Sequence, residues 1–350
     1  MSTSNPSSPA AASSAHPRPT QTKIFVHASS PQNPVDIAGI IAQHEVFAPL
    51  PPSNDPSYAT LKAALPRRPV ALILHGVLAH KDQIYHKKLV DALPIDSFRF
   101  DFRANHETPG SWGMAKFGDD VDDLRAVIMF LRERYNYSIE LIVGHSRGSI
   151  VGWAYYARFA EAMRVDPEED IPLWASVAGR WRMAGIHKRD AEFNAGFAKE
   201  GVYRWKVRVA GQDREVIVRP EDVEAFAKFP MEQTVRNFPA DTDCLILHGT
   251  ADKTVPTCDA AGYVNTLTGP GRRPGSCQLC LIEDADHNLR GKFDEVVEAI
   301  VSWRQSRLAA RAAPEEAAQR AGLPAAAAAP STGEAMERTW RQSTDSKVRL

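Results

Sequence analysis

Cysteine is scarce in this sequence, which has only four among its 350 residues: Cys244, Cys258, Cys277 and Cys280. So few cysteines exclude a dense disulfide framework and favour a reducing compartment. Cys277 and Cys280 form a Cys-x-x-Cys pair, but they fall in a strand-like run whose residues would point to opposite faces. No second such pair and no histidine cluster accompanies them. We therefore predict no zinc or other metal site.

The sequence also lacks a long apolar run and a charge bias. No stretch approaches the roughly 20 apolar residues of a membrane-spanning helix, and the N-terminus has no apolar secretory signal. The 42 lysines and arginines balance 43 acidic residues, for a formal net charge of -1. Such a balance gives no basic surface for nucleic acid. We expect no membrane span and no nucleic-acid partner, and the oligomeric state stays open.

The expected location is the cytoplasm. The last three residues, Val348-Arg349-Leu350, come near a peroxisomal address and make the peroxisome the alternative, although Val348 is not the small residue that such a signal needs.

Both ends of the chain differ in composition from its middle. Residues 1–20 are mainly serine, proline and alanine, and we predict a disordered tail there. Residues 309–350 are alanine-rich and predict a low-complexity tail that is disordered or loosely helical. The folded domain is expected to span residues 21–308. Its content of hydrophobic and charged residues is ordinary for a globular enzyme.

Between the tails, strand and helix patterns alternate along the chain. Short apolar runs that alternate with amphipathic helices favour an α/β fold, with a doubly wound, mostly parallel sheet. The predicted strands are 24–27 and 37–41, which form a leading hairpin, and then 70–74, 98–102, 138–143, 173–177, 244–247 and 277–282. The predicted helices are 86–93, 121–135, 149–159 and 293–303.

The alternation breaks at about residues 182–240. Residues 203–209 and 214–218 alternate polar with apolar side chains and predict a hairpin, and Pro220 opens a helix. An insertion after the strand at 173–177 would sit above the carboxyl edge of the sheet, where ligands bind. We interpret this insertion as a small cap over the site. The alternative is an insertion on the protein surface that has no role in substrate binding.

The segment Gly144-His145-Ser146-Arg147-Gly148 lies between a strand-like run and a helix-like run. A serine on so tight a turn is held in strained geometry, with its hydroxyl over the sheet edge. Glycines two residues to either side avoid collisions with the neighbouring strand and helix. We therefore predict that Ser146 is a nucleophile, with a plain structural turn as the alternative.

A serine nucleophile needs a base, and the base needs an orienting acid. In this architecture the chain order is serine, then acid, then histidine. Asp252 follows the strand 244–247, and His287 lies in the loop after the last predicted strand. We predict His287 as the general base and Asp252 as the acid, with Asp284 or Asp286 as substitutes.

The oxyanion that forms on an attacked carbonyl needs preorganised donors, usually backbone N–H groups. The residue after the nucleophile, Arg147, supplies one in this prediction. The other is expected from the loop after the strand 70–74, where Gly76 allows close approach of the backbone. Val77 is the predicted donor and Leu78 the alternative.

These motifs resemble those of the α/β hydrolases of the serine esterase type. The resemblance covers about residues 23–308 and is carried, in the expected order, by His75-Gly76, Gly144 to Gly148, Gly249 to Pro256 and Asp286-His287. The turn Gly144 to Gly148, called the elbow below, is similar to that of cinnamoyl- or feruloyl-esterase-like enzymes and related fungal esterase-like proteins, which carry a short cap. The resemblance implies an α/β-hydrolase fold and a chain segment Asp-x-Arg-Gly-x-Gly. Here that segment is Asp101-Phe-Arg-Ala-Asn-His-Glu107, in which Ala104 and His106 replace glycines.

The leading hypothesis is hydrolysis of a small-molecule carboxylic ester through an acyl-enzyme, without a metal or organic cofactor. Leu78, Trp181, Tyr203 and Trp205 are the candidate substrate-binding residues, with core or hairpin packing as the alternative for the aromatic ones. An aminopeptidase-like amide hydrolase is the second hypothesis. It would need an acidic pocket for an amino group, from Glu107 or Glu283. A non-catalytic ligand-binding protein on the same fold is the third.

Overall fold

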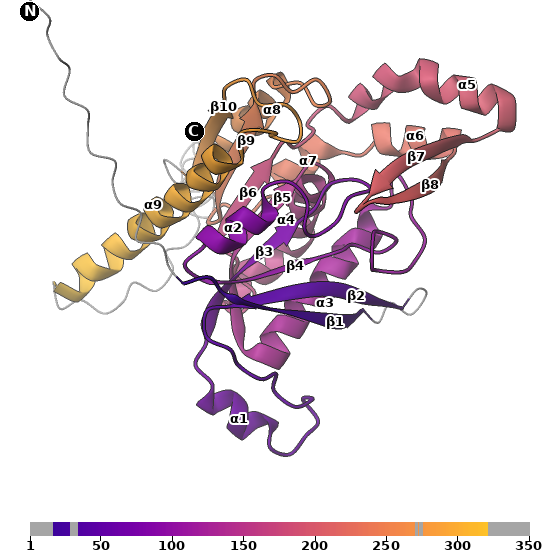
Figure 1. Cartoon of the computed structure of the whole chain (residues 1–350). Coiled ribbons are helices and arrows are strands. Elements are labelled where there is room, and N and C mark those ends of the chain that lie inside the picture. Colours follow the sequence, from indigo (N-terminus) through magenta and orange to yellow (C-terminus); the bar gives the residue numbers. More distant parts are fainter. Residues whose placement is uncertain (1–16, 29–33, 270–271, 273–275, 321–350) are drawn as a thin grey trace, which may run out of the picture.

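A computed structural model describes residues 17–28, 34–269, 272 and 276–320 of the chain (Figure 1). Eight strands form one sheet in the order β1-β2-β4-β3-β5-β6-β9-β10. Their bounds are β1 Thr20–Ala28, β2 Val35–Gln43, β3 Arg68–Leu74, β4 Asp96–Phe100, β5 Tyr137–His145, β6 Leu173–Val177, β9 Asp243–Gly249 and β10 Cys277–Ile282.

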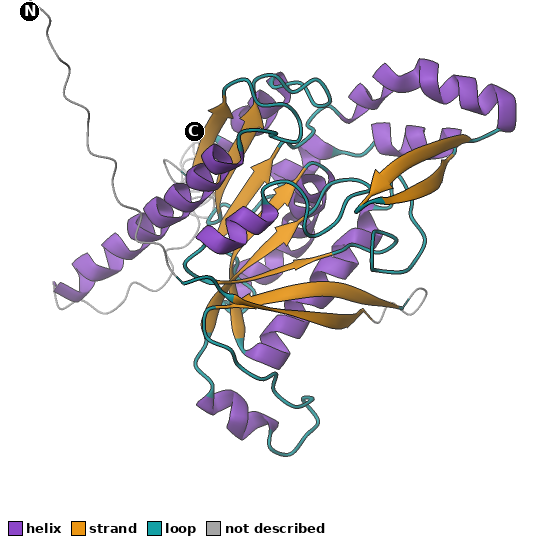
Figure 2. Cartoon of the chain, in the orientation of Figure 1, coloured by secondary structure: helices purple, strands orange, loops and turns teal. Residues whose placement is uncertain are grey.

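The sheet is parallel from β4 to β10, whereas β1 pairs antiparallel with β2, and β2 pairs antiparallel with β4. The central strands β3, β5, β6 and β9 are almost entirely buried, because helices cover both of their faces. Figure 2 shows this sheet between two helical layers. The predicted doubly wound, mostly parallel fold is confirmed.

Two hydrophobic cores lie on opposite faces of the sheet. One contains side chains of α3 (Phe117–Tyr135), α4 (Arg147–Val165) and α8 (Cys258–Leu267). The other contains side chains of α2 (His86–Ala92) and α9 (Phe293–Arg320). A short helix, α1 (Tyr58–Ala64), projects at one end of the sheet and has no buried residue (Figure 1).

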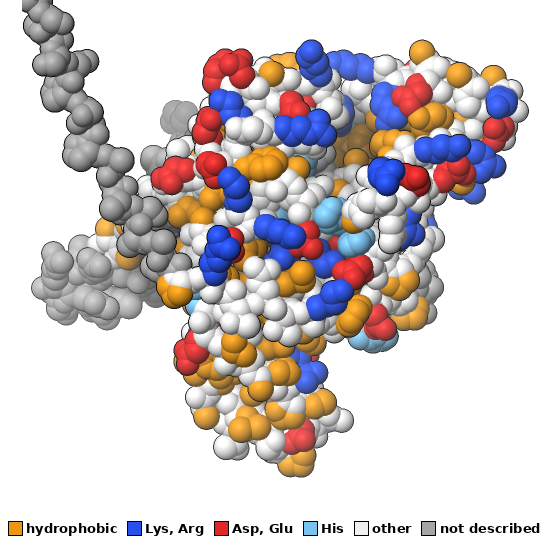
Figure 3. Space-filling view, in the orientation of Figure 1, with side chains coloured by type: hydrophobic (Ala, Val, Ile, Leu, Met, Phe, Trp, Pro, Cys, Tyr) orange, Lys and Arg blue, Asp and Glu red, His pale blue; other side chains and the backbone are white. Residues whose placement is uncertain are grey.

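The insertion between β6 and β9 contains a second, two-stranded sheet. The predicted hairpin is formed by β7 (Tyr203–Val209) and β8 (Gln212–Val218), which pair antiparallel. The rest of the insertion is helical: η1 (Met183–Arg189), α5 (Asp190–Glu200), α6 (Pro220–Ala227) and α7 (Met231–Arg236). Figure 3 looks onto the face where this insertion stands beside the sheet, and a hollow with hydrophobic side chains lies between them.

The closing helix differs from its prediction. It continues to Arg320, well past the predicted end at Trp303 and into the predicted tail, because the added segment is rich in alanine, arginine and glutamate, which favour helix. Residues 1–16 and 321–350 of the predicted tails, including Val348 to Leu350, lie outside the described residues, and Thr20, at the end of the predicted N-terminal tail, begins β1. No helix in the described part of the chain is long and apolar enough to cross a bilayer.

Candidate active site

Ser146 occupies a strained turn between β5 and α4, with φ 52° and ψ −112°. The flanking residues Gly144 and Gly148 have no room for a side chain, because other backbone atoms lie too close. A Cβ on Gly144 would lie 2.5 Å from the carbonyl oxygen of Gly148, and one on Gly148 would lie 2.7 Å from the carbonyl oxygen of Leu74. Backbone strain of this kind costs on the order of 1–3 kcal/mol and persists where the surroundings enforce it. The surroundings here are the ends of β3 and β5.

Three residues from distant parts of the chain form a continuous chain of hydrogen-bonding contacts. Nε2 of His287 lies 2.9 Å from Oγ of Ser146, and Nδ1 of His287 lies 2.7 Å from Oδ2 of Asp252. The Ser146 and His287 side chains are half-buried, whereas Asp252 is buried. The structure therefore brings the predicted nucleophile, base and acid into mutual contact at the carboxyl edge of the sheet.

The Asp252 carboxylate is stabilised in its ionised form. Its Oδ1 accepts hydrogen bonds from the backbone N–H groups of Thr254 and Val255, both at 2.8 Å. Although burial acts in the opposite direction, the hydrogen bonds from His248, His287 and the backbone hold the pKa of the Asp252 carboxyl below its ordinary value. A negative charge is thus kept beside the ring that would become positive during catalysis.

Of the alternative acids Asp284 and Asp286, neither forms a hydrogen bond to the His287 ring among the described residues. Oδ1 of Asp286 accepts from the backbone N–H groups of Asn288 and Arg290, both at 3.0 Å, and so stabilises the turn that follows His287. Asp284 is exposed and has a left-handed backbone, with φ 56°. The structure therefore places Asp252, and neither substitute, against the imidazole.

Two further histidines support the site without facing solvent. Nε2 of His145 donates to the backbone carbonyl of His287 at 2.9 Å, which ties the residue before the nucleophile to the loop of the candidate base. Nε2 of His75 accepts from the backbone N–H of Phe102 at 3.0 Å. Burial lowers the pKa of His145 to about 3 and that of His75 to about 4, so both rings are neutral at neutral pH.

The segment after β3 passes directly beside the nucleophile. A Cβ on Gly76 would lie 3.1 Å from Nδ1 of His145 and 3.5 Å from Cβ of Ser146, so only glycine leaves this space open. Leu78, two residues on, has a left-handed backbone with φ 46°. The candidate oxyanion donors Val77 and Leu78 therefore follow the closest approach of this segment to Ser146.

The side chain of Arg147 points away from the reacting groups and holds the elbow in place. Its Nε donates to Oδ2 of Asp120 at 2.8 Å, and its Nη1 donates to the carbonyl of Met114 at 2.6 Å. Burial raises the pKa of the Asp120 carboxyl to about 6, although the arginine acts against this shift. Arg147 thus offers its backbone N–H to the site, while its guanidinium anchors the loop before α3.

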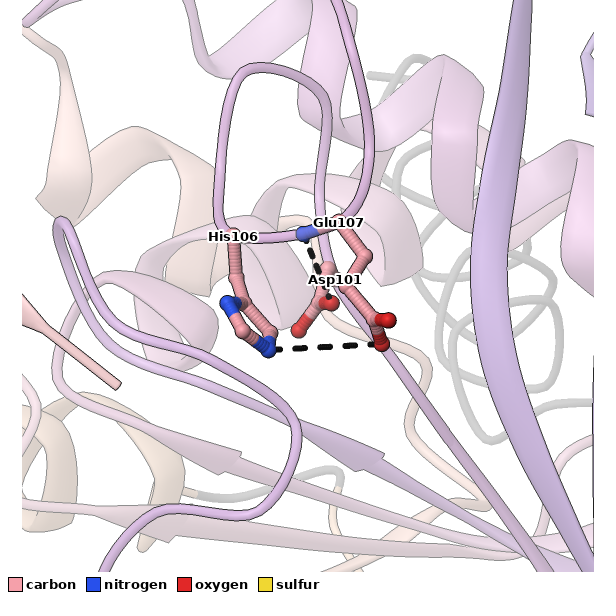
Figure 4. Close-up of side chains that lie close together, drawn as sticks. All are labelled: Asp101, His106 and Glu107. Atoms are coloured by element: carbon pink, nitrogen blue, oxygen red, sulfur yellow. Dashed lines mark hydrogen bonds and ion pairs between the residues drawn. The ribbon is translucent and has the colours of Figure 1, made fainter. Parts of the chain in front are cut away.

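A partly buried ion-pair cluster lies near the segment that carries Val77 and Leu78. Asp101, His106 and Glu107 lie close enough together to suggest a cation site (Figure 4). However, Nζ of Lys81 already lies 2.7 Å from Oδ2 of Asp101 and 2.5 Å from Oε2 of Glu107. The lysine therefore supplies the positive charge, and we propose no metal there. The backbone N–H of Lys81 also donates to Asp101, which ties this segment to the end of β4.

The loop after β4 keeps a glycine-like backbone without glycines. Ala104 and His106, which stand where the resemblance implies glycines, have φ values of 58° and 43°. Left-handed geometry costs an L-residue about 1–2 kcal/mol. The Asn105 side chain supports the loop by donating to the carbonyls of Phe102 and Arg103.

A cavity of about 500 Å³ lies between this loop and the hairpin β7–β8, and Leu78 is one of its lining residues. The other three candidate substrate-binding residues lie outside it. Trp205 packs edge-to-face on Trp112, a lining residue, at 6.1 Å between ring centroids. Trp181 packs on Tyr263. Tyr203 packs on Phe193. Leu78 is thus the candidate that reaches the cavity.

Comparison with known proteins points to one fold. No family model matches the sequence. The uncharacterized protein YDL057W of Saccharomyces cerevisiae is 24% identical, over 63% of this chain and 69% of its own. Est1E from Butyrivibrio proteoclasticus has a TM-score of 0.54 at 15% identity, covering 82% of this chain and 99% of its own. The Pyrococcus furiosus esterase Pf2001 has a TM-score of 0.56 at 13% identity, covering 82% and 91%.

Identities this low between solved structures establish a shared architecture and leave the substrate open. Together with the sheet order, the strained serine turn and the helical layers, they identify this chain as a protein of the α/β-hydrolase fold.

Proposed function

We propose that this protein is a serine hydrolase that cleaves carboxylic esters through an acyl-enzyme. The observation that carries the proposal is the unbroken contact from Ser146 Oγ through the His287 ring to the Asp252 carboxylate. The esterases among its structural relatives, one of which holds ferulic acid in a solved structure, support an ester rather than another acyl compound as substrate.

In the proposed first half-reaction, Ser146 Oγ attacks the ester carbonyl carbon while His287 Nε2 takes the hydroxyl proton. The carbonyl oxygen becomes an oxyanion that accepts hydrogen bonds from the backbone N–H groups of Arg147 and of Val77 or Leu78. Collapse of the tetrahedral intermediate breaks the bond to the alcohol oxygen, and His287 gives that oxygen its proton. In the second half-reaction, water replaces the alcohol and releases the acid, regenerating the Ser146 hydroxyl.

Asp252 keeps His287 in the required tautomer. Its carboxylate accepts a hydrogen bond from Nδ1–H, so that Nε2 is left free to receive the proton of Ser146, and it stabilises the imidazolium that forms. An amide substrate would use the same groups. However, Glu107, one of the two carboxylates considered for binding a free amino group, is already paired with Lys23 and Lys81.

The proposal is tested with Ser146→Ala and a matched control, Ser302→Ala, in which an exposed serine on α9 is removed. Ser146→Ala should lower kcat for 4-nitrophenyl esters by at least about 10³-fold, and the control should match the wild type. A fluorophosphonate probe should label the wild type and the control at Ser146, as identified by mass spectrometry of the adduct. Unchanged turnover by Ser146→Ala, or a probe that reacts elsewhere, would refute the mechanism.

A further inference from the structure

The cavity beside the hairpin, called here the hairpin cavity, meets the segment of the candidate oxyanion donors at Leu78. Its lining comes from Leu78, the loop 104–116, the hairpin β7–β8 and the first turn of α6. Leu78 belongs to the segment that carries the candidate oxyanion donors. Arg147, directly after Ser146, binds the carbonyls of Gly113 and Met114 in the loop that forms the opposite wall. A group bound in the hairpin cavity would therefore be close to a carbonyl attacked by Ser146.

The walls of the hairpin cavity carry more positive than negative charge. Lys116, Arg214 and Arg219 line it, and none of them forms an ion pair with any described residue. Of its two acidic residues, Glu215 is paired with Arg204 and Lys206 elsewhere on the hairpin. The other, Asp222, accepts a hydrogen bond from the backbone N–H of Arg219. Within the described residues, the lining thus holds three cations without an ion-pair partner and one such carboxylate, while Nη2 of Arg214 donates to the His106 carbonyl and to Gln212.

The backbone of the loop 104–116 leaves space for one of these cations at the cavity wall. The stem of Lys116 lies over Gly113, where a Cβ would be 2.6 Å from Cδ of the lysine. Gly113 therefore makes room for the lysine at the cavity wall.

We propose that the hairpin cavity binds an anionic group, a carboxylate or a phosphate, carried by the ester substrate, and that Lys116, Arg214 and Arg219 hold it. This inference rests on the proposed function and adds the substrate class to it. Leu78, Trp112 and Ile217 supply an apolar wall for the chain or ring between the anion and the scissile ester. The preferred substrate is then an acidic ester rather than a neutral one.

The test compares 4-nitrophenyl monoesters of dicarboxylic acids, from adipate to sebacate, with neutral 4-nitrophenyl alkanoates of the same chain length. A third series carries a phosphonate in place of the distal carboxylate and identifies which anion is preferred. The variant Lys116→Met/Arg219→Gln removes two cavity charges. The control Lys199→Met/Arg208→Gln removes two exposed charges from the same insertion, at residues that neither line the cavity nor pair with a residue that lines it.

The wild type should favour the anionic over the neutral series, measured as the ratio of their kcat/KM values. The cavity variant should lower this ratio by about tenfold or more, through the anionic series alone, and the control should keep the ratio of the wild type. A wild type without a preference, or a cavity variant with an unchanged ratio, would overturn the inference.

Binding to an inactive protein separates this inference from the proposed function. Monomethyl adipate and monomethyl suberate are titrated calorimetrically into Ser146→Ala with and without the two cavity substitutions. Binding that is lost with the substitutions supports the cavity even if no ester is cleaved and no probe labels Ser146, a result that would refute only the proposed function. Binding that is absent, or equal in both proteins, counts against the cavity even where esters are cleaved.

Discussion

At the scale of single residues, the candidate site depends on groups that have no freedom to exchange partners. The carboxylate of Asp252 is held on one oxygen by two backbone N–H groups and on the other by His287. The guanidinium of Arg147 is held by Asp120 and by two backbone carbonyls. The side chains of Asp252 and Arg147 are both buried. Loss of His287 would leave the Asp252 charge without its side-chain partner, and loss of Asp120 would do the same to Arg147.

We predict that Asp252→Asn lowers kcat for ester hydrolysis by about 10³- to 10⁴-fold with little change in KM, because an amide does not stabilise the imidazolium and allows the wrong tautomer. Steady-state kinetics on a 4-nitrophenyl ester measure the effect. Asp284→Asn is the matched control, because asparagine tolerates the left-handed backbone at that position. Equal losses in the two variants would show that Asp252 has no special role.

At the scale of elements, the elbow keeps its strained geometry because β3, β5 and α4 pack closely at Gly144 and Gly148. Sequence patterns were sufficient here: a buried strand, a five-residue motif and an amphipathic helix are all local signals. They also located Asp252 and His287, since both follow strands whose ends meet at one edge. The ion pairs of Lys81 with Asp101 and of Arg147 with Asp120 were not predicted, because partners 20 and 27 residues apart leave no periodic signal.

Helices of the insertion were largely missed for a related reason. Helix α5 buries only Phe193, so its apolar periodicity is weak. The hairpin was found because alternation with period two persists where one face of a strand is solvated. Helix α9 was predicted too short, since its continuation depends on alanine-rich propensity rather than on a buried stripe.

The close packing of the elbow predicts a stability difference between two glycines. Gly148→Ala should lower the free energy of unfolding by about 3 kcal/mol, because its methyl group meets the carbonyl oxygens of Leu74 and His75 at 2.7 and 2.8 Å. Gly118→Ala, in α3, meets nothing within 4 Å and should raise stability by up to about 1 kcal/mol. Urea unfolding measures both, and a Gly148→Ala protein as stable as the wild type would contradict the packing described here.

At the scale of the whole molecule, stability should depend on pH through three buried histidines. Burial lowers the pKa of His75 to about 4 and of His145 to about 3, and holds that of His86 well below its ordinary value. Between pH 6.5 and 4 the unfolded chain therefore binds more protons than the folded protein, and acidification favours unfolding. Asp120, whose pKa is raised to about 6, acts in the opposite direction over the same range.

The net effect is a fall in the free energy of unfolding on the order of 4 kcal/mol from pH 7 to pH 5, with each histidine contributing up to about 1.4 kcal/mol per pH unit. Urea unfolding at half-unit steps of pH gives the profile. His27→Asn, which removes an exposed histidine, should reproduce the wild-type curve. A curve that is flat across this range would show that the three rings are protonated without unfolding.

The hydrogen bond from His145 to the carbonyl of His287 also bears on how firmly the candidate base is held. If the loop of His287 moved away from the end of β5, the buried ring of His145 would lose its acceptor, at a cost of about 1–3 kcal/mol. The distance between the imidazole and Ser146 is therefore fixed from within the folded core, by a side chain that touches neither reacting atom, although His287 itself lies on a loop.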